Sequence, residues 1–212
     1  MITQLEHDCM SVFEKVFPVS VREEIVSLMK EAYRTRDRWM NESDDFLERK
    51  IGAKDLPAHL LRAAIENAAR SYCNNGRLPF KFSVIGNSAK NCHHVELVLN
   101  DYKIYFVRAA FETEKPGIGI KQALYRPIVE MDLFNPNEST SFHPSTFFIT
   151  YGDYCTDSLK FVNIGIPGTN SWLFLKHLSL ESTFIKPVVP DKEDQILVTL
   201  VNEDGAINEK AK

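Results

Sequence analysis

Hydrophobic positions in the first third of the chain recur at the spacing of amphipathic helices. The clearest apolar stripe comprises Val21, Ile25, Leu28, Met29, Ala32 and Trp39. Ser20 and Glu23 form a capping box in front of this stripe. Thr3 and Glu6 form a similar box before a shorter apolar stripe, which ends at Pro18. The pattern therefore predicts two consecutive helices.

A third long helix is predicted after a polar stretch. Asp55 and Pro57 indicate its start, because Asp caps a helix and Pro is favoured in the first turn. Its buried face would consist of Leu60, Leu61, Ala64, Ile65, Ala68, Ala69 and Tyr72. Asn74-Asn75-Gly76 supplies the stop, since these residues tolerate the left-handed backbone conformation. A further short helix is expected from Asp44 to Lys50.

From residue 78 onward the chain is rich in β-branched and aromatic residues, which favour strands. Strands are expected at residues 80–85, 95–99, 104–109, 128–134, 146–151, 159–166, 172–175 and 196–201. Asn100-Asp101 predicts a hairpin between the second and third of these strands. Val95 and Leu97 alternate with Glu96, which is typical of a half-exposed strand.

The helices come first and the strands follow without alternation. This order predicts an α+β fold, in which N-terminal helices pack on a largely antiparallel, strongly twisted β-sheet from the C-terminal two-thirds. One domain is expected over residues 1–201, with a helical part (1–77), a β-rich part (78–201) and a polar tail (202–212). A division near residue 78 into two domains is the alternative.

Composition and charge narrow the functional classes. The 212 residues are 44% hydrophobic and 25% charged, which is ordinary for a globular protein, and the net charge is −4. That charge gives no general attraction to nucleic acid or to an anionic membrane. We find no secretory signal, no apolar run long enough to span a membrane, and no Cys-x-x-Cys pair among four cysteines. We therefore expect a soluble, cytoplasmic protein.

Motifs for common chemistries are missing from the sequence. It contains neither a phosphate-binding Gly-x-x-x-x-Gly-Lys loop nor a Gly-x-Ser-x-Gly nucleophile elbow. The densest group of metal-ligand residues is Cys92-His93-His94. Alternate strand residues share a face, so Cys92 and His94 are the weak candidates for a shared metal. A polar strand start that binds no metal is the other interpretation.

One arrangement of charged residues resembles a nuclease family. Glu66 lies on a predicted helix, Glu96 on the following hairpin, and Asp101-Tyr102-Lys103 has the form acid-x-Lys. This arrangement resembles the PD-(D/E)xK nucleases. The resemblance implies that the carboxylates hold magnesium and that Lys103 assists the attacking water. The Pro-Asp pair is missing, and Asp101 lies at the predicted turn. In the alternative interpretation, Glu66 pairs with Arg62 or Arg70 on the helix surface.

A basic ridge is the basis for a second alternative. Lys30, Arg34 and Arg38 recur every four residues along the second helix, where they could contact phosphate groups of a nucleic acid. Acidic residues, among them Glu31 and Asp37, are interleaved with the ridge. A solvated face of mixed charge is the competing explanation.

The leading hypothesis is a non-enzymatic interaction or regulatory protein, such as an accessory protein of a mobile element or defence system. Two segments, residues 142–154 and 167–172, are rich in the aromatic residues that dominate protein interfaces. Phe142, Tyr154 and Trp172 are the candidate binding residues. We expect a protein partner, and an open edge strand would favour a homodimer. No cofactor is expected; magnesium belongs only to the nuclease alternative.

Overall fold

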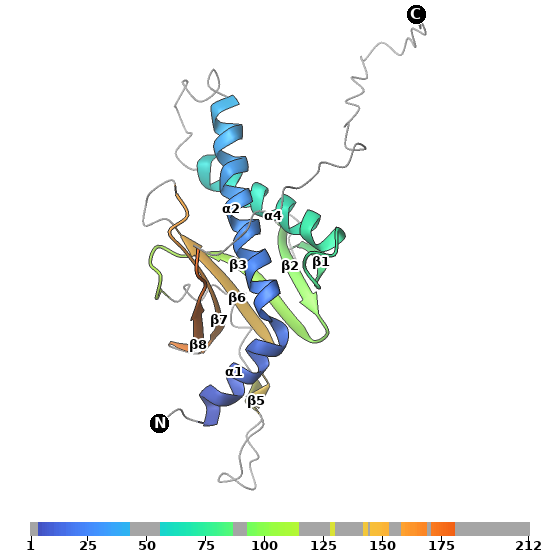
Figure 1. Cartoon of the computed structure of the whole chain (residues 1–212), viewed down its shortest axis with the longest axis vertical. Helices are drawn as coiled ribbons and strands as arrows, with labels where there is room; N and C mark the ends of the chain where they lie inside the picture. The colour runs from blue at the N-terminus through green and yellow to red at the C-terminus, as the bar shows by residue number, and fades with distance from the viewer. Residues whose placement is uncertain are drawn as a thin grey trace, which may run out of the picture.

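The computed structural model describes residues 4–42, 56–86, 93–114, 128–129, 142–143, 145–152, 158–168 and 171–180. Their helices are α1 (Gln4–Val16), α2 (Val19–Glu42) and α4 (Leu56–Asn74). The strands are β1 (Lys81–Gly86), β2 (His93–Leu99), β3 (Tyr102–Arg108), β4 (Ile128–Val129), β5 (Phe142–His143), β6 (Thr146–Gly152), β7 (Phe161–Pro167) and β8 (Trp172–His177). Figure 1 shows their arrangement.

The first two helices are separated at Phe17 and Pro18, as the sequence predicts. The amide of Phe17 closes the last turn of α1 on the carbonyl of Phe13, at 2.8 Å. The carbonyl of Pro18 then accepts the amides of Val21 and Arg22, which starts α2. Proline has no amide to extend α1, but it is well tolerated where a helix begins. The predicted apolar stripe of α2 is buried from Val21 to Ala32.

Helix α4 ends in a Schellman motif. Gly76 has a φ of 69°, and the amide of Arg77 donates to the carbonyl of Tyr72 at 2.9 Å. The left-handed φ explains why a glycine follows this helix. The predicted stop at Asn74-Asn75-Gly76 is thus confirmed.

Helices α2 and α4 run antiparallel and are joined by polar bonds. The Tyr72 hydroxyl donates to Oε2 of Glu31 at 2.8 Å, and the Arg77 Nε donates to Oε2 of Glu24 at 2.8 Å. Burial, and then the bond to Glu31, raise the pKa of Tyr72 well above its ordinary value. Burial raises the pKa of the neighbouring Cys73 thiol to about 11. The two bonds therefore hold the C-terminal end of α4 beside the N-terminal half and middle of α2.

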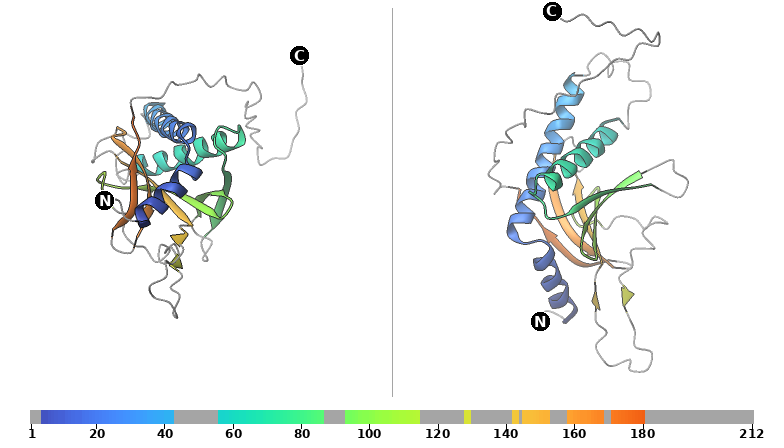
Figure 2. Two further views of the ribbon diagram at one scale, coloured as in Figure 1. Left: turned by 60° about the horizontal axis from the view of Figure 1, so that its bottom comes forward. Right: turned by 90° about the vertical axis from the view of Figure 1, so that its right-hand side faces the viewer.

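Six strands form one sheet in the order β1-β2-β3-β6-β7-β8, and β4 and β5 form a separate small pair. Every neighbouring pair in the large sheet is antiparallel except β3 and β6, which are parallel. The three helices lie along one side of the curved sheet (Figure 2). The α+β fold with a largely antiparallel, twisted sheet is confirmed.

Aromatic rings fill the core between the helices and the sheet. The ring of Phe17, just after α1, lies 5.0 Å from that of Phe147 on β6 and 5.9 Å from that of Phe80. Phe13 contacts Phe174 on β8 at 5.0 Å between ring centroids. The helices and the sheet thus share one hydrophobic core. None of the helices in the described ranges is long and apolar enough to span a membrane.

The opposite face of the sheet is also buried over its middle strands. Phe148 on β6 and Asn163 on β7 are at most 3% exposed, although their side chains point away from the helices. Residues 109–114, which follow β3, lie over this face. The Asn163 amide donates to the carbonyl of Glu112 at 2.7 Å, and the Trp172 indole donates to that of Thr113 at 3.3 Å. Both bonds fix the segment on the sheet.

The β2–β3 hairpin opens into a fork. Asn100 takes the left-handed conformation at the turn, with φ 53°, and the strands then pair over three residues each. The last pair is Leu97 with Ile104. Beyond it, residues 93–96 of β2 pair only with β1, and residues 105–108 of β3 pair only with β6. We call these eight residues the fork. Figure 1 shows the two strands running apart from their turn.

Two details differ from the sequence-based expectation. Glu96 is only 5% exposed, whereas alternation predicted a solvent-facing position. Its carboxylate accepts a bond from the Tyr105 hydroxyl and lies 3.4 Å from Lys103 Nζ, which offsets the cost of burial. Much of the aromatic segment 142–154 is strand β6, whose seven residues are all buried. The expected helix at 44–50, the strand at 196–201 and the tail at 202–212 lie outside the described residues.

Candidate functional site

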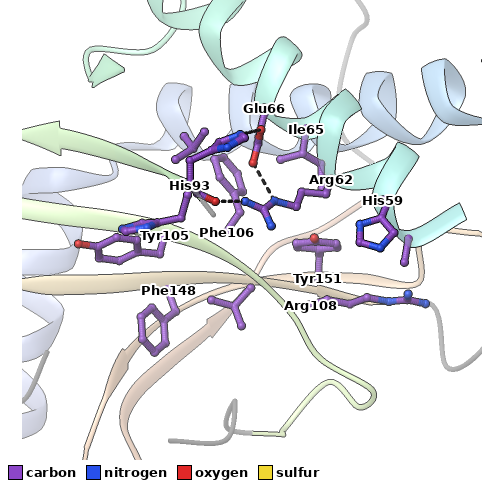
Figure 3. Close-up of a pocket in the computed structure, with 14 residues that line it drawn as sticks. His59, Arg62, Ile65, Glu66, His93, Tyr105, Phe106, Arg108, Phe148 and Tyr151 are labelled. Atoms are coloured by element: carbon purple, nitrogen blue, oxygen red, sulfur yellow. Dashed lines mark hydrogen bonds and ion pairs between the residues drawn. The ribbon is translucent and has the colours of Figure 1, made fainter. Parts of the chain in front are cut away.

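A pocket of about 510 Å³ lies between α4 and the fork (Figure 3). It is lined by the successive residues His93, His94 and Val95 of β2, and by residues 105–108 of β3. Neighbouring strand residues point to opposite faces, so a cavity that touches all of them borders the edges of the strands. The pocket therefore exists because the ladder between β2 and β3 stops early. We call it the fork pocket.

One wall of the fork pocket is a polar stripe on α4. His59, Arg62 and Glu66 are spaced by three and four residues, so they lie on one face of the helix. Ala64, Ala68 and Ala69 are buried on the other side of α4, which lets the helix approach its neighbours closely. Packing of the apolar face thus turns the polar stripe toward the fork.

Arg62 connects the helix to the open edge of β2. Its Nε donates to Oε1 of Glu66 at 2.9 Å, and its guanidinium also donates to the backbone carbonyl of His93. Glu66 Oε2 lies 3.6 Å from Nε2 of His93, so the carboxylate links the two cationic groups. Arginine here replaces part of the backbone pairing that β2 lacks at the fork. Figure 3 shows the three side chains as one cluster.

The remaining lining combines positive charge with aromatic surface. Arg108 of β3 enters at the far side from Glu66, and His94 stacks against Tyr105 with 5.9 Å between ring centroids. Phe106, Phe148 and Tyr151 add aromatic walls. Three of the six histidines of the chain line this one pocket.

The charge of the pocket is opposite to that of the whole protein. Arg62 and Arg108 face a single carboxylate, Glu66, among the described residues of the lining. The chain itself carries a net charge of −4. Each histidine adds a positive charge when protonated. The arrangement can therefore hold an anion, with aromatic surface beside it for an organic group.

The residues of the nuclease hypothesis separate into two groups. Glu96 and Lys103 lie together, 3.4 Å apart, but neither lines the fork pocket. Glu66 faces the pocket and pairs with Arg62, which fits the alternative interpretation. Asp101 is exposed at the hairpin turn. Arg70 does not pair with Glu66 but lies over the Phe82 ring, 5.2 Å from its centroid.

Only one of the two weak metal candidates lies in the described part of the structure. Cys92 lies outside the described residues, and His94 lines the fork pocket against Tyr105. Within the described ranges, no group of three His, Cys, Asp or Glu residues is placed to hold a metal ion.

Only some of the interface and nucleic-acid candidates lie in the described part of the structure. Arg34 and Arg38 are exposed on α2, as the basic ridge requires, whereas Lys30 donates to the carbonyl of Leu180. Trp172 is half-buried and contacts the Phe148 ring in an edge-on geometry. Tyr154, and the side chain of Phe142, lie outside the described part of the structure.

Sequence reasoning did not identify His59, Arg62, His93 and Arg108 as one site. A signal was present on α4, because His59, Arg62 and Glu66 follow helical spacing beside the apolar stripe. The strand residues carried no such signal, since a fork depends on where pairing stops. That property depends on long-range contacts that local patterns do not encode.

A second, smaller cavity of about 260 Å³ lies between α2 and the end of β8. Its arginine, Arg22, is already paired with Glu14 at 3.0 Å. His177 nearby contacts Asn163 Oδ1 at 2.8 Å and Glu112 Oε1 at 3.0 Å. The contacts of His177 hold the segment after β3 on the sheet. The polar groups at this cavity thus already serve structural contacts, and the fork pocket is the stronger candidate site.

Comparison with known protein families, with curated proteins and with solved structures finds no match to this chain.

Proposed function

We propose that the protein binds a phosphorylated organic molecule in the fork pocket. The observation that carries this proposal is the convergence of two arginines and three histidines on one cavity of an acidic protein. Guanidinium groups bind phosphate through paired, charge-assisted hydrogen bonds, and imidazolium adds further donors. A volume of about 510 Å³ lies within the range usual for small-molecule sites.

Glu66 acts in this proposal as an internal counterion. It occupies Arg62 at 2.9 Å in the absence of ligand, and an arriving phosphate would share or replace that contact. The pair is partly exposed, with side-chain exposures of 45% for Arg62 and 21% for Glu66, so opening it costs little. The organic part of the ligand would lie against Phe106 and Tyr151.

Isothermal titration calorimetry with adenosine monophosphate, ribose 5-phosphate and inorganic phosphate tests the proposal. We expect saturable binding that Arg62→Gln and Arg108→Gln each weaken by at least about 10-fold, the usual cost of one charge-assisted bond. Arg34→Gln is the matched control, because Arg34 is an exposed arginine on α2 that does not line the pocket. Equal loss in Arg34→Gln would place binding on the basic ridge, and absence of binding to every probe would reject the proposal.

A further inference from the structure

The fork pocket has an arrangement of histidines that matters for catalysis as well as binding. His59 and His93 are both exposed at the pocket and come from different walls, α4 and β2. Along α4, His59 lies three residues before Arg62 and Glu66 lies four residues after it. A helix rises 1.5 Å per residue, so these steps are about 4.5 Å and about 6 Å. Glu66 in turn holds His93, at 3.6 Å.

A phosphate bound to Arg62 would therefore lie between two imidazoles. Figure 3 shows Arg62 between His59 on one side and the Glu66–His93 pair on the other. Displacement at phosphorus places the attacking and leaving oxygens on opposite sides of the phosphorus atom. A base on one side and an acid on the other is the arrangement that such a displacement needs.

The lining also indicates where the nucleophile comes from. Among the described residues of the pocket there is no serine, threonine, cysteine, aspartate or lysine; its hydroxyl groups are those of Tyr151 and of Tyr105, which donates to Glu96. A substrate that carries its own nucleophile beside the phosphate fits such a lining best. The 2′-hydroxyl of RNA has this position relative to its 3′ phosphodiester.

Resting on the proposed function, we propose that the protein cleaves single-stranded RNA in the fork pocket by transesterification. His93 accepts the proton of the 2′-hydroxyl, and the 2′ oxygen forms a bond to phosphorus. The bond from phosphorus to the 5′ oxygen breaks, and His59 donates a proton to that oxygen. The products are a 2′,3′-cyclic phosphate and a 5′-hydroxyl, and Arg62 and Arg108 stabilise the charge that develops on phosphorus.

Glu66 is a positioning residue in this scheme. Its carboxylate lies 3.6 Å from Nε2 of His93, where it orients the imidazole that acts as the base. The same carboxylate stabilises the imidazolium that forms when His93 accepts the proton. Base and acid are thereby assigned to His93 and His59 respectively.

The test uses two oligonucleotides with the full chain. One is DNA throughout, and the other is the same DNA with a single ribonucleotide in its middle. In EDTA, we expect both to bind, and only the second to be cut, 3′ of the ribonucleotide, leaving a 2′,3′-cyclic phosphate. His59→Gln and His93→Gln should each slow cleavage at least about 100-fold, the usual contribution of a general acid or base. Affinity for the all-DNA strand, measured in the same variants, should fall much less than the cleavage rate, which separates a loss of chemistry from a loss of binding.

His7→Gln is the matched histidine control, because His7 lies on α1, far along the chain from the pocket residues, with a side chain that is 77% exposed and lies near Asp8. Its rate should equal that of the natural protein. The rate of the natural protein should depend on pH as a bell-shaped curve, since one imidazole must be neutral and the other charged. In Glu66→Gln we expect slower cleavage and a displaced pH maximum, together with tighter phosphate binding.

The outcomes distinguish the two proposals. Binding of the all-DNA strand without cleavage of the chimeric strand would overturn the RNA cleavage and leave phosphate binding intact. Failure to bind either strand or any phosphate probe would overturn both. Cleavage that requires magnesium and is abolished by Glu96→Gln would assign the chemistry to the Glu96–Lys103 pair and also overturn the inference.

Discussion

The two halves of the sheet differ in how completely their strands are paired and in the side chains they carry. On the β3-β6-β7-β8 side, the strands pair along most of their length, and every residue of β6 and β7 is buried. On the β1-β2 side, only three residue pairs connect β2 to β3, and the edge strand β1 exposes Val84 and Ile85. The β3-β6-β7-β8 side is packed mainly with aromatic and aliphatic side chains, whereas charged and imidazole groups border the fork. The contrast indicates that stability resides mainly in the first half, and the proposed binding site lies in the second.

The largest expected effect tests the β3-β6-β7-β8 half of the sheet, which we call the closed half because its strands pair along most of their length. Phe147→Ala removes a fully buried ring that contacts Phe17 and Tyr102, so it should lower the free energy of unfolding by about 3–5 kcal/mol. Urea unfolding followed by circular dichroism measures this loss. Val84→Ala, an apolar truncation at an exposed position of β1, is the control and should cost less than about 0.5 kcal/mol. Similar costs for the two variants would contradict the division.

A smaller effect is expected where the two halves meet. The Tyr105 hydroxyl donates to the buried carboxylate of Glu96 at the first position beyond the β2–β3 ladder. Tyr105→Phe should lower the free energy of unfolding by about 1–2 kcal/mol, because the carboxylate loses a donor that water does not replace. Phe148→Leu, on the same face but without a polar group, is a useful comparison. If Tyr105→Phe is neutral in urea unfolding, the bond does not hold the base of the fork.

The smallest expected effect concerns the helical layer, at high pH. The pKa of Tyr72 is raised above its ordinary value of about 10, so the folded state retains a proton that the unfolded state loses. The ionisation of Tyr72 therefore leaves the free energy of unfolding unchanged below pH 9 and lowers it as the pH rises through 10. Between pH 9 and 11, Tyr72→Phe should lose about 1 kcal/mol less than the natural protein, measured by urea unfolding. An identical loss in both proteins would show that Tyr72 ionises freely in the fold.

Local patterns predicted the closed half and the helices well. The stripe from Val21 to Ala32 is buried as expected, because a helix fixes its inward face by spacing alone. The stop at Gly76 was predictable for a similar reason, since a left-handed φ favours glycine. The parallel pairing of β3 with β6 was not predictable. It joins segments separated by about 40 residues, and no local pattern records such a contact.

The candidate site was predicted only in fragments. Glu66 and its bond to Arg62 were anticipated from the helix, and His94 was considered only as a metal ligand. The alternation around Glu96 predicted an exposed carboxylate, but Tyr105 and Lys103 from the next strand supply partners that allow its burial. Which side chains of β2 and β3 line one site depends on where the ladder between the two strands ends. The twist of the sheet, which local sequence does not encode, determines that end.

The early end of the β2–β3 ladder, at Leu97 and Ile104, also affects how this protein can evolve. Residues 93–95 and 105–108 line a cavity across the fork and do not pair with each other, and each strand is secured by its outer partner. Substitutions at their pocket-facing positions would alter what is recognised while leaving the register of the sheet in place. A library confined to those positions would therefore sample new ligand preferences at little cost in folding, which makes the fork a natural starting point for redesign.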